Sequence, residues 1–236
     1  RKLEQQGFTV DYLPVDQWGT VSADQLSQAV TDKTILVSFM HVNNEVGTIQ
    51  PIPQIASMKG KALFHVDGVQ SFGKLPLSAG AADLISISGH KIHGPKGVGA
   101  LYIAKNAKII PQLLGGGQEN GLRSGTENVP AIAGFGVAAE MAFANLTERN
   151  NHVAQIKQRL LEGILELIPD IVVNSPEWSS PYILNVSFLG TRGEVLLHQL
   201  EQQGIYVSTG AACSTNKKGK SHVLLAMGRE YTFSSV

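Results

Sequence analysis

The chain has little that would indicate a disulfide-bonded, membrane or nucleic-acid-binding protein. Cys213 is its single cysteine, so no internal disulfide can form. No apolar run approaches the roughly 20 residues of a membrane span, and the first residues lack the apolar region of a signal peptide. Lysine plus arginine and aspartate plus glutamate both number 19, so no net charge attracts nucleic acid or an anionic membrane. These absences predict a cytoplasmic protein whose partner is a small molecule.

Several catalytic signatures are also missing. No Walker A sequence and no G-x-G-x-x-G sequence occurs, which excludes phosphate-loop nucleotide enzymes and Rossmann dehydrogenases. The seven histidines are scattered, and no C-x-x-C or H-E-x-x-H pattern occurs, so we expect no metal site. His41 and His65 precede polar clusters at predicted strand ends; such histidines are more often packed than catalytic, and we assign them no role.

The first part of the chain is predicted to be a layered α/β sheet. Its residues follow the ordinary composition of such proteins, with 43% hydrophobic residues and 25 glycines among 236. Short apolar runs that stop at polar residues and glycine predict strands. We expect these strands at 8–13, 34–39, 62–66, 83–88 and 98–103. A helix at 51–59 would make a right-handed strand-helix-strand unit.

Beyond residue 105 the chain becomes glycine-rich, and a helix of small residues is expected at 131–145. Apolar residues then recur at spacings of three and four, which predicts a long amphipathic helix that ends at Pro169. Strands at 171–174, 182–188 and 205–208, with a helix at 193–203, would follow. We therefore predict a partial large domain over residues 1–146 and a small α+β domain over residues 147–236.

An acid and a lysine stand just beyond two of the predicted strands. Asp67 follows the strand at 62–66, and Lys91 comes three residues after the strand at 83–88. Ligands of α/β sheets bind at the carboxyl ends of strands, so the two side chains can face one ligand. Pyridoxal phosphate needs this pair: an amine to form a Schiff base, and a carboxylate that keeps the pyridine nitrogen protonated. Taken separately, each residue is also typical of a solvated turn.

Other polar residues near these two can complete such a site. Ser88 and His90 offer a hydroxyl and an imidazole for a phosphate. Gln70 either solvates its turn or donates to the phenolic oxygen of the ring. The sequence HVNNEVG is typical of a tight turn, although an asparagine there, Asn43 or Asn44, can donate to the same oxygen.

Two loops carry further candidates. The segment GGGQENGLRSGTENV is either a flexible loop or an anion site built from backbone amides with Arg123, Ser124 and Thr126. A free cysteine is usually a small buried hydrophobe. Cys213, however, lies among small residues and shortly before three lysines, which favour the thiolate. We interpret Cys213 as a nucleophile.

Five segments together resemble the pyridoxal-phosphate-dependent cysteine desulfurases of the NifS-like (IscS) group, within the class V aminotransferase superfamily. In family order they are FMHVNNEVGTIQPI, FHVDGVQSFGKLPL, DLISISGHKIHGPKGVGALYI, GGGQENGLRSGTENVPAIAGF and STGAACST. The resemblance extends from about Phe8 to about Gly228. It implies a homodimeric fold type I enzyme with an incomplete, mainly parallel sheet, helices on the faces of that sheet, and a small carboxyl-terminal domain.

The resemblance also implies the reaction. Lys91 matches the Schiff-base lysine, Asp67 the partner of the pyridine nitrogen, and Cys213 the nucleophile that takes up sulfur. L-cysteine would give L-alanine and a persulfide on Cys213. A scaffold or carrier protein would accept that sulfur for iron–sulfur cluster or thio-cofactor synthesis.

The remaining cofactor contacts are implied by the same resemblance. Asn44 and Gln70 match the side chains that bond the phenolic oxygen, and Ser88 and His90 match phosphate ligands. Thr126 matches the residue that reaches the phosphate of the neighbouring subunit. Two alternatives stay open: an inactive remnant that acts at most as a binding partner, and a selenocysteine lyase-like or other class V enzyme.

The sequence departs from the family pattern near both ends. Upstream of the region that matches Arg1 the family has a Gly-Thr phosphate loop and a ring-stacking histidine. After Met227 it has an arginine for the substrate carboxylate, and Arg229 does not match that position. Asn120 stands where the family usually has arginine. We therefore expect an N-terminally truncated chain with a divergent C-terminus, whose uncovered strand edges lower its solubility.

Overall fold

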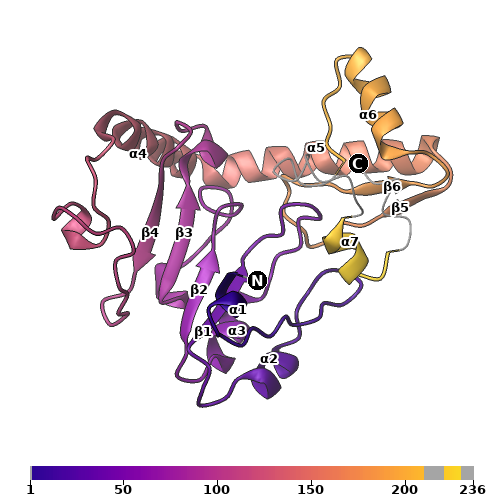
Figure 1. Cartoon of the computed structure of the whole chain (residues 1–236). Coiled ribbons are helices and arrows are strands. Elements are labelled where there is room, and N and C mark those ends of the chain that lie inside the picture. The colour runs from indigo at the N-terminus through magenta and orange to yellow at the C-terminus, as the bar shows by residue number, and fades with distance from the viewer. Residues whose placement is uncertain (1, 210–220, 230–236) are drawn as a thin grey trace. The chain divides into compact units, whose positions relative to one another are not determined.

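The computed structural model describes residues 2–209 and 221–229, and Cys213 lies outside them. Figure 1 shows the helices and strands of the chain, which divides into two compact units. Unit 2 comprises residues 34–41 and 61–149, and unit 1 comprises residues 1–33, 42–60 and 150–236. The predicted division into residues 1–146 and 147–236 stays a prediction; the compact units differ from it by grouping two amino-terminal segments with the carboxyl-terminal part.

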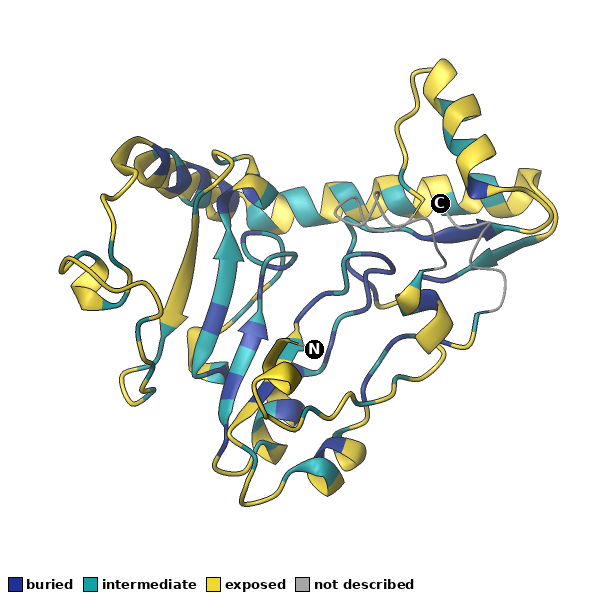
Figure 2. Ribbon diagram, viewed as in Figure 1, coloured by how far each residue is buried: buried dark blue, intermediate teal, exposed yellow. Residues whose placement is uncertain are grey.

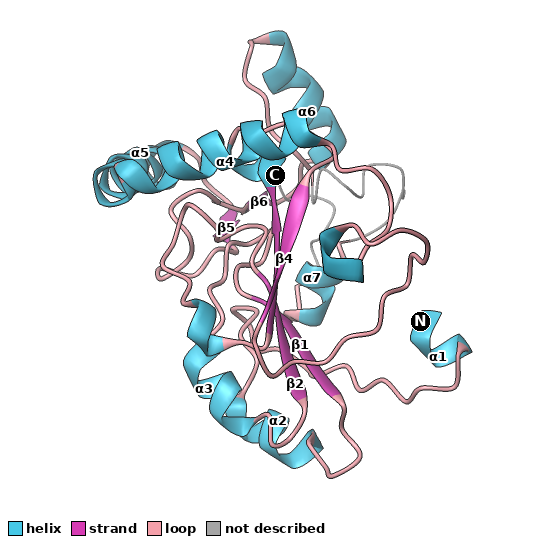
Figure 3. Ribbon diagram, turned by 90° about the vertical axis from the view of Figure 1, so that its left-hand side faces the viewer, coloured by secondary structure: helices cyan, strands magenta, loops and turns pink. Residues whose placement is uncertain are grey.

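Unit 2 is built on a four-stranded sheet in the order β1-β2-β3-β4 (Figure 1), whose strands are coloured magenta in Figure 3. The strands are β1 (Leu36–Met40), β2 (Leu63–Asp67), β3 (Leu84–Ser88) and β4 (Gly99–Ile103). β1, β2 and β3 are parallel, and β4 runs antiparallel to β3. The predicted mainly parallel α/β fold is confirmed, with strand bounds close to those expected from the apolar runs.

The two faces of β2 differ in chemistry because side chains alternate along a strand. Phe64 and Val66 are completely buried on one face. His65 and Asp67 are half-buried on the other face. β4, in contrast, is exposed from Gly99 to Tyr102 (Figure 2). The polar face of β2 is therefore the face available for a ligand.

Helix α4 (Val129–Ala144) covers the turn that carries Lys91. Asn128 caps it by accepting a hydrogen bond from the Ala131 amide, and a proline stands in its first turn. Three of its buried residues, Phe135, Ala138 and Ala142, pack against Ile92 of η2 (Gly89–Ile92), a 3-10 turn that follows β3. Ala131 is also buried. Small side chains let the helix approach η2 closely.

The remainder of unit 2 consists of two short 3-10 turns and connecting loops. They are η1 (Ala79–Ala81) and η3 (Glu119–Gly121). Arg149 closes the unit by donating to the carbonyl oxygens of Gly73 and Ala142, both at 2.6 Å. This side chain ties the carboxyl-terminal end of α4 to the loop that follows β2.

The described part of unit 1 contains helices and a small antiparallel sheet. Its elements are α1 (Lys2–Gln5), α2 (Ala23–Ala29), α3 (Ile52–Met58), β5 (Ile171–Val173), β6 (Val186–Phe188), α6 (Gly193–Gln202) and α7 (His222–Ala226). The long helix α5 (Leu146–Leu167) begins in unit 2 and continues into unit 1. α2 packs against α3, and β5 pairs with β6.

Two predicted strands are wrong, and a third is shorter than predicted. Residues 8–13 and 205–208 are irregular, and the strand predicted at 182–188 is reduced to Val186–Phe188. Within the described part of the chain, no neighbouring strand supplies ladder hydrogen bonds to residues 8–13 or 205–208. An apolar run becomes a strand only where such a partner exists.

No single helix of residues 2–209 and 221–229 is both long and apolar enough to cross a membrane. α4 and α5 satisfy the same criteria only when taken together, and they meet at a bend of 74°.

Candidate active site

Asp67 is the last residue of β2 and lies between two parallel neighbours, paired with Met40 on β1 and with Ser86 on β3. Its backbone carbonyl accepts a hydrogen bond from the His41 amide at 2.9 Å. Its carboxylate Oδ1 accepts from the Val69 amide at 3.0 Å. The turn therefore orients the carboxylate through one oxygen, and Oδ2 is the second acceptor that a ligand can use.

The turn after Asp67 is tightly packed. The Phe72 amide donates to the Gly68 carbonyl at 2.8 Å. A Cβ at Gly68 would lie 2.8 Å from Leu77 Cδ2 and 3.1 Å from Ile85 Cγ2, so a larger residue would require these side chains to shift. Gln70, predicted to contact the ring, is half-buried in this turn. It therefore lies on the same connection as Asp67.

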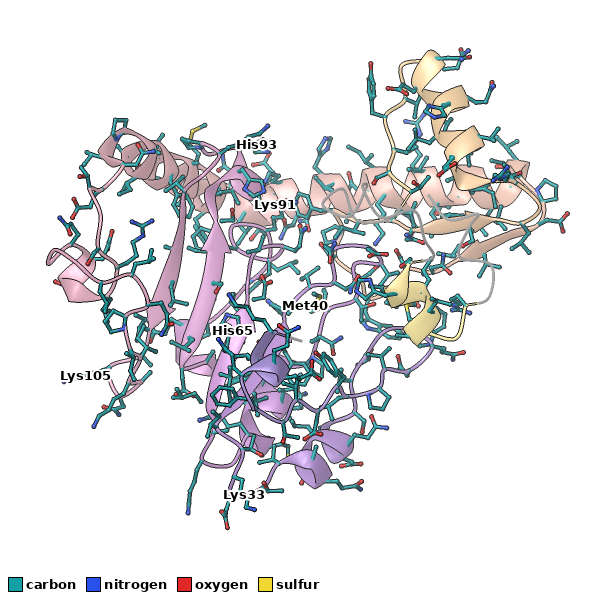
Figure 4. All side chains as sticks on the ribbon, in the orientation of Figure 1. Lys33, Met40, His65, Lys91, His93 and Lys105 are labelled. Atoms are coloured by element: carbon teal, nitrogen blue, oxygen red, sulfur yellow. The ribbon has the colours of Figure 1, made fainter. Side chains whose placement is uncertain are left out.

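The predicted lysine and phosphate ligands follow β3 directly. Ser88 ends β3, and His90 and Lys91 lie in η2. Ser88 Oγ and His90 Nδ1 are hydrogen-bonded at 2.8 Å. His93 adopts a left-handed backbone with φ of 66° just after η2. Figure 4 shows Lys91 and His93 beyond the end of the strands, while His65 lies on β2 itself.

Lys91 belongs to a group of three cations around Lys74. Burial lowers the pKa of Lys74, and the positive charges of Lys91 and Arg149 lower it further. We call Lys74, Lys91 and Arg149 the cationic cluster. Its members repel one another, so an anionic ligand beside them is favoured.

A row of three polar side chains crosses the sheet on the face of Asp67. His65 Nδ1 is hydrogen-bonded to Ser38 Oγ, and His65 Nε2 to Ser86 Oγ, both at 2.8 Å. Burial lowers the pKa of His65, and the Asp67 charge opposes that shift. Sequence reasoning gave His65 no role. The signal was the alternate spacing in HVD and SIS, which places His65 with Asp67 and Ser86 with Ser88 on one face.

The glycine-rich loop bonds mainly to itself. Ser124 Oγ donates to the Gly116 carbonyl at 2.8 Å, and the Gly125 amide donates to Gln118 Oε1 at 3.2 Å. Thr126 is the next residue after this hydrogen-bonded segment and is exposed. The loop thus presents Thr126 outward, just before α4. Within residues 2–209 and 221–229, no group of three or more His, Cys, Asp or Glu side chains can hold a metal ion.

Asn44 belongs to unit 1, where a tight turn holds it. Asn43 Oδ1 organises the turn by accepting from the amides of Glu45 at 2.8 Å and Val46 at 3.0 Å. Asn44 is half-buried beside it. Glu45 is buried and accepts a short hydrogen bond from Ser221 Oγ, the cap of α7. No pattern in the sequence indicated that this carboxylate is buried.

The chain is similar to proteins of known family along almost its whole length. The aminotransferase class-V family model matches residues 1–232. A cysteine desulfurase IscS of Methanosarcina thermophila is 47% identical over 230 residues, which is 96% of this chain. Among solved structures, a NifS-like protein superposes with a TM-score of 0.90 at 42% identity over 99% of this chain. A structure described as SspA in complex with cysteine superposes with a TM-score of 0.81 at 35% identity over 99% of this chain.

The coverage of these proteins is partial. The chain spans 57% of the Methanosarcina desulfurase, 63% of the NifS-like structure and 66% of SspA. Within that span the resemblance to NifS-like cysteine desulfurases is confirmed. The chain belongs to the aminotransferase class-V family.

Proposed function

We propose that this chain is the cofactor-binding and sulfur-carrying part of a pyridoxal-phosphate-dependent cysteine desulfurase. The observation that carries the proposal is the placement of Asp67 and of the Lys91 turn. Asp67 ends β2, and the turn follows β3, the parallel strand directly beside it. Sequence identities of 42–47% to proteins named cysteine desulfurase support the reaction.

The residues present fit pyridoxal phosphate. Asp67 keeps Oδ2 as an acceptor for a protonated ring nitrogen, since Oδ1 is held by the turn. The cationic cluster favours the phosphate charge, and the Ser88 and His90 side chains can turn from each other to donate to it. In the proposal, Lys91 supplies the amine that holds the cofactor.

The remaining contacts complete the proposed site. Gln70 and Asn44 donate to the phenolic oxygen of the ring, and Thr126 reaches the phosphate bound by the second subunit of a homodimer. The exposure of Thr126 supports that last role, because a residue that serves a neighbouring subunit must face outward. The cofactor supplies an electron sink when it is bound.

In the proposed reaction, Lys91 and Cys213 carry out different steps. The Lys91 amine moves the α-proton of L-cysteine. The Cys213 thiolate attacks the substrate sulfur: a sulfur–sulfur bond forms, the carbon–sulfur bond breaks, and the carbon takes up a proton. L-cysteine and the thiol thus become L-alanine and a persulfide, with no outside oxidant or reductant. A sulfur-acceptor scaffold or carrier protein receives the sulfur.

Cofactor binding is tested by titrating the purified chain with pyridoxal phosphate and recording its visible absorbance. We expect a saturable band that is lost in Lys91→Ala. Lys105→Ala is the matched control, because Lys105 is exposed beyond β4, and it should keep the band. A wild-type chain without a band at saturating cofactor would overturn the proposal.

The sulfur step is tested on the cofactor-loaded chain. With L-cysteine present we expect equal amounts of alanine and persulfide sulfur, and Cys213→Ser should stop sulfur transfer while it leaves the absorbance band unchanged. A serine variant that releases sulfur at the full rate would refute the role of Cys213.

A further inference from the structure

We propose that His65, a neutral imidazole hydrogen-bonded to Ser38 and Ser86, is a positioning residue for Asp67; this inference rests on the proposed function. The imidazole lies between two serine hydroxyls of neighbouring strands, with both ring nitrogens bonded at 2.8 Å. Nothing in the proposed reaction uses this histidine. Its place on the sheet, however, connects it to the carboxylate that would hold the ring.

The geometry of β2 relates His65 to Asp67. His65 and Asp67 are two residues apart on β2, so their side chains leave the same face of the sheet. Ser86 is the register partner of Asp67 on β3, yet its hydroxyl bonds back to His65. The Ser86 residue therefore lies beside Asp67, and its hydroxyl is fixed by the hydrogen bond to His65.

The two serine hydrogen bonds are compatible with a neutral imidazole. A neutral imidazole has one donor and one acceptor nitrogen, and a hydroxyl can act as either, so both bonds can form without a proton being added. Burial lowers the pKa of His65 and outweighs the attraction of Asp67. Since the ordinary pKa is 6.5, His65 is neutral at pH 7.

The neutral state of His65 is important because the Asp67 carboxylate carries a single negative charge. A cationic side chain two residues away on the same face would attract that charge and compete with a protonated ring. A neutral imidazole occupies the space, fixes Ser86 and leaves the carboxylate charge for the ligand. The row Ser38–His65–Ser86 thus supports Asp67 without neutralising it.

The test compares three substitutions of His65. His65→Phe removes both hydrogen bonds; in His65→Gln the amide occupies the place of Nε2 and can still bond Ser86, and in His65→Asn it occupies the place of Nδ1 and can still bond Ser38. By analogy with the outer partners of metal ligands, we expect the phenylalanine variant to bind pyridoxal phosphate about tenfold more weakly. Glutamine should restore most of the affinity, and asparagine less.

The spectrum separates positioning from simple destabilisation. The pH at which the visible band of the bound cofactor changes wavelength depends on the charge held at the ring nitrogen, so it should shift in His65→Phe and return in His65→Gln. Ser86→Ala should reproduce the shift more fully than Ser38→Ala. Circular dichroism checks the fold of each variant. His198→Phe is the control, because its side chain is 71% exposed on α6.

The outcomes distinguish this inference from the function on which it rests. A wild-type chain without Lys91-dependent binding would overturn both. Binding by the wild type, with an unchanged affinity and pH midpoint in His65→Phe, would overturn the role of His65 alone. As a readout on the chain without cofactor, nitrogen NMR of labelled histidine should show His65 as a neutral ring at pH 7; a protonated ring there would also refute the inference.

Discussion

Helices α4 and α5 follow one another in the chain and use their apolar residues in opposite ways. α4 buries four residues, three of which pack against Ile92 beside Lys91. α5 has the more regular apolar pattern, yet its apolar residues remain uncovered: Ile156 and Leu160 are each 54% exposed, and Leu167 is 77% exposed. Together with Ile164 they line a shallow groove. We call these four residues the α5 apolar stripe.

Apolar periodicity predicts that a segment is helical and which of its faces is apolar, but it does not predict what that face contacts. On α4 the contact is short-range and is made by small residues and one ring. Among the described residues, the α5 apolar stripe makes no such contact and remains largely exposed. Substitutions on the two helices should therefore have very different effects on stability.

The largest effect is expected for Phe135→Ala on α4. Phe135 is 8% exposed and packs edge-on against Phe72 with ring centroids 6.1 Å apart. Loss of the ring from this core should lower the free energy of unfolding by about 3–5 kcal/mol. Phe143→Ala is the matched control, because Phe143 contacts the same ring but is 48% exposed. Urea unfolding measures both; equal losses would contradict the comparison.

A smaller effect is expected at Lys157, which packs its amine inward from α5. Its Nζ donates to Ser179 Oγ at 2.7 Å and to the Ser180 carbonyl at 2.9 Å. Burial lowers its pKa from 10.5 to about 8. Between these two values the unfolded chain holds a proton that the folded chain has lost, so stability rises with pH across this window. Below it both states are protonated, and the cost of burying the charge is constant.

Lys157→Met should remove this contribution. After allowance for solvent screening, we expect the wild type to gain about 1–2 kcal/mol more than the variant between pH 7.5 and pH 10. Unfolding in urea at a series of pH values measures the difference. Lys33→Met, at an exposed residue, is the control and should follow the wild type. Parallel pH profiles for Lys157→Met and the wild type would disprove the assignment.

The smallest change in stability is expected for Leu160→Gln in the α5 apolar stripe. Leu160 is 54% exposed, so the substitution should alter the free energy of unfolding by no more than about 0.5 kcal/mol. It should, however, reduce self-association, because it interrupts an exposed apolar groove. Sedimentation velocity measures this. A loss of stability as large as that of Phe135→Ala would mean that the stripe is covered within the chain.

Much of unit 2 could be predicted from the sequence because its strands are short apolar runs bounded by polar residues. The errors arose where strand pairing decides the outcome: residues 205–207 form an apolar run, but Ile205 and Tyr206 are 51% and 80% exposed. Helix α2 was missed although Ser22 caps it, because only Leu26 of that helix is buried and its apolar pattern is therefore weak.

The site was predictable in part. Asp67 and Lys91 were identified because each stands beyond a strand end, and the sheet places those strands side by side. The roles of the eight predicted residues remain proposals, and Cys213 lies outside the described residues. The row from Ser38 through His65 to Ser86 was missed, because it depends on the order and register of three strands. Spacing alone shows which face a residue takes, but not which strand lies beside it.

The discontinuous division of the chain has a consequence for its synthesis on the ribosome. Unit 2 uses residues 34–41 and 61–149, so every segment of its sheet and of the Lys91 turn is available once residue 149 has emerged. Unit 1 is completed later: residues 1–33 and 42–60 emerge before residue 149, but they group with residues 150–236. Because domains fold as units during translation, the unit that carries Asp67 and Lys91 can form first, while residues 1–33 and 42–60 depend on residues 150–236, which emerge later.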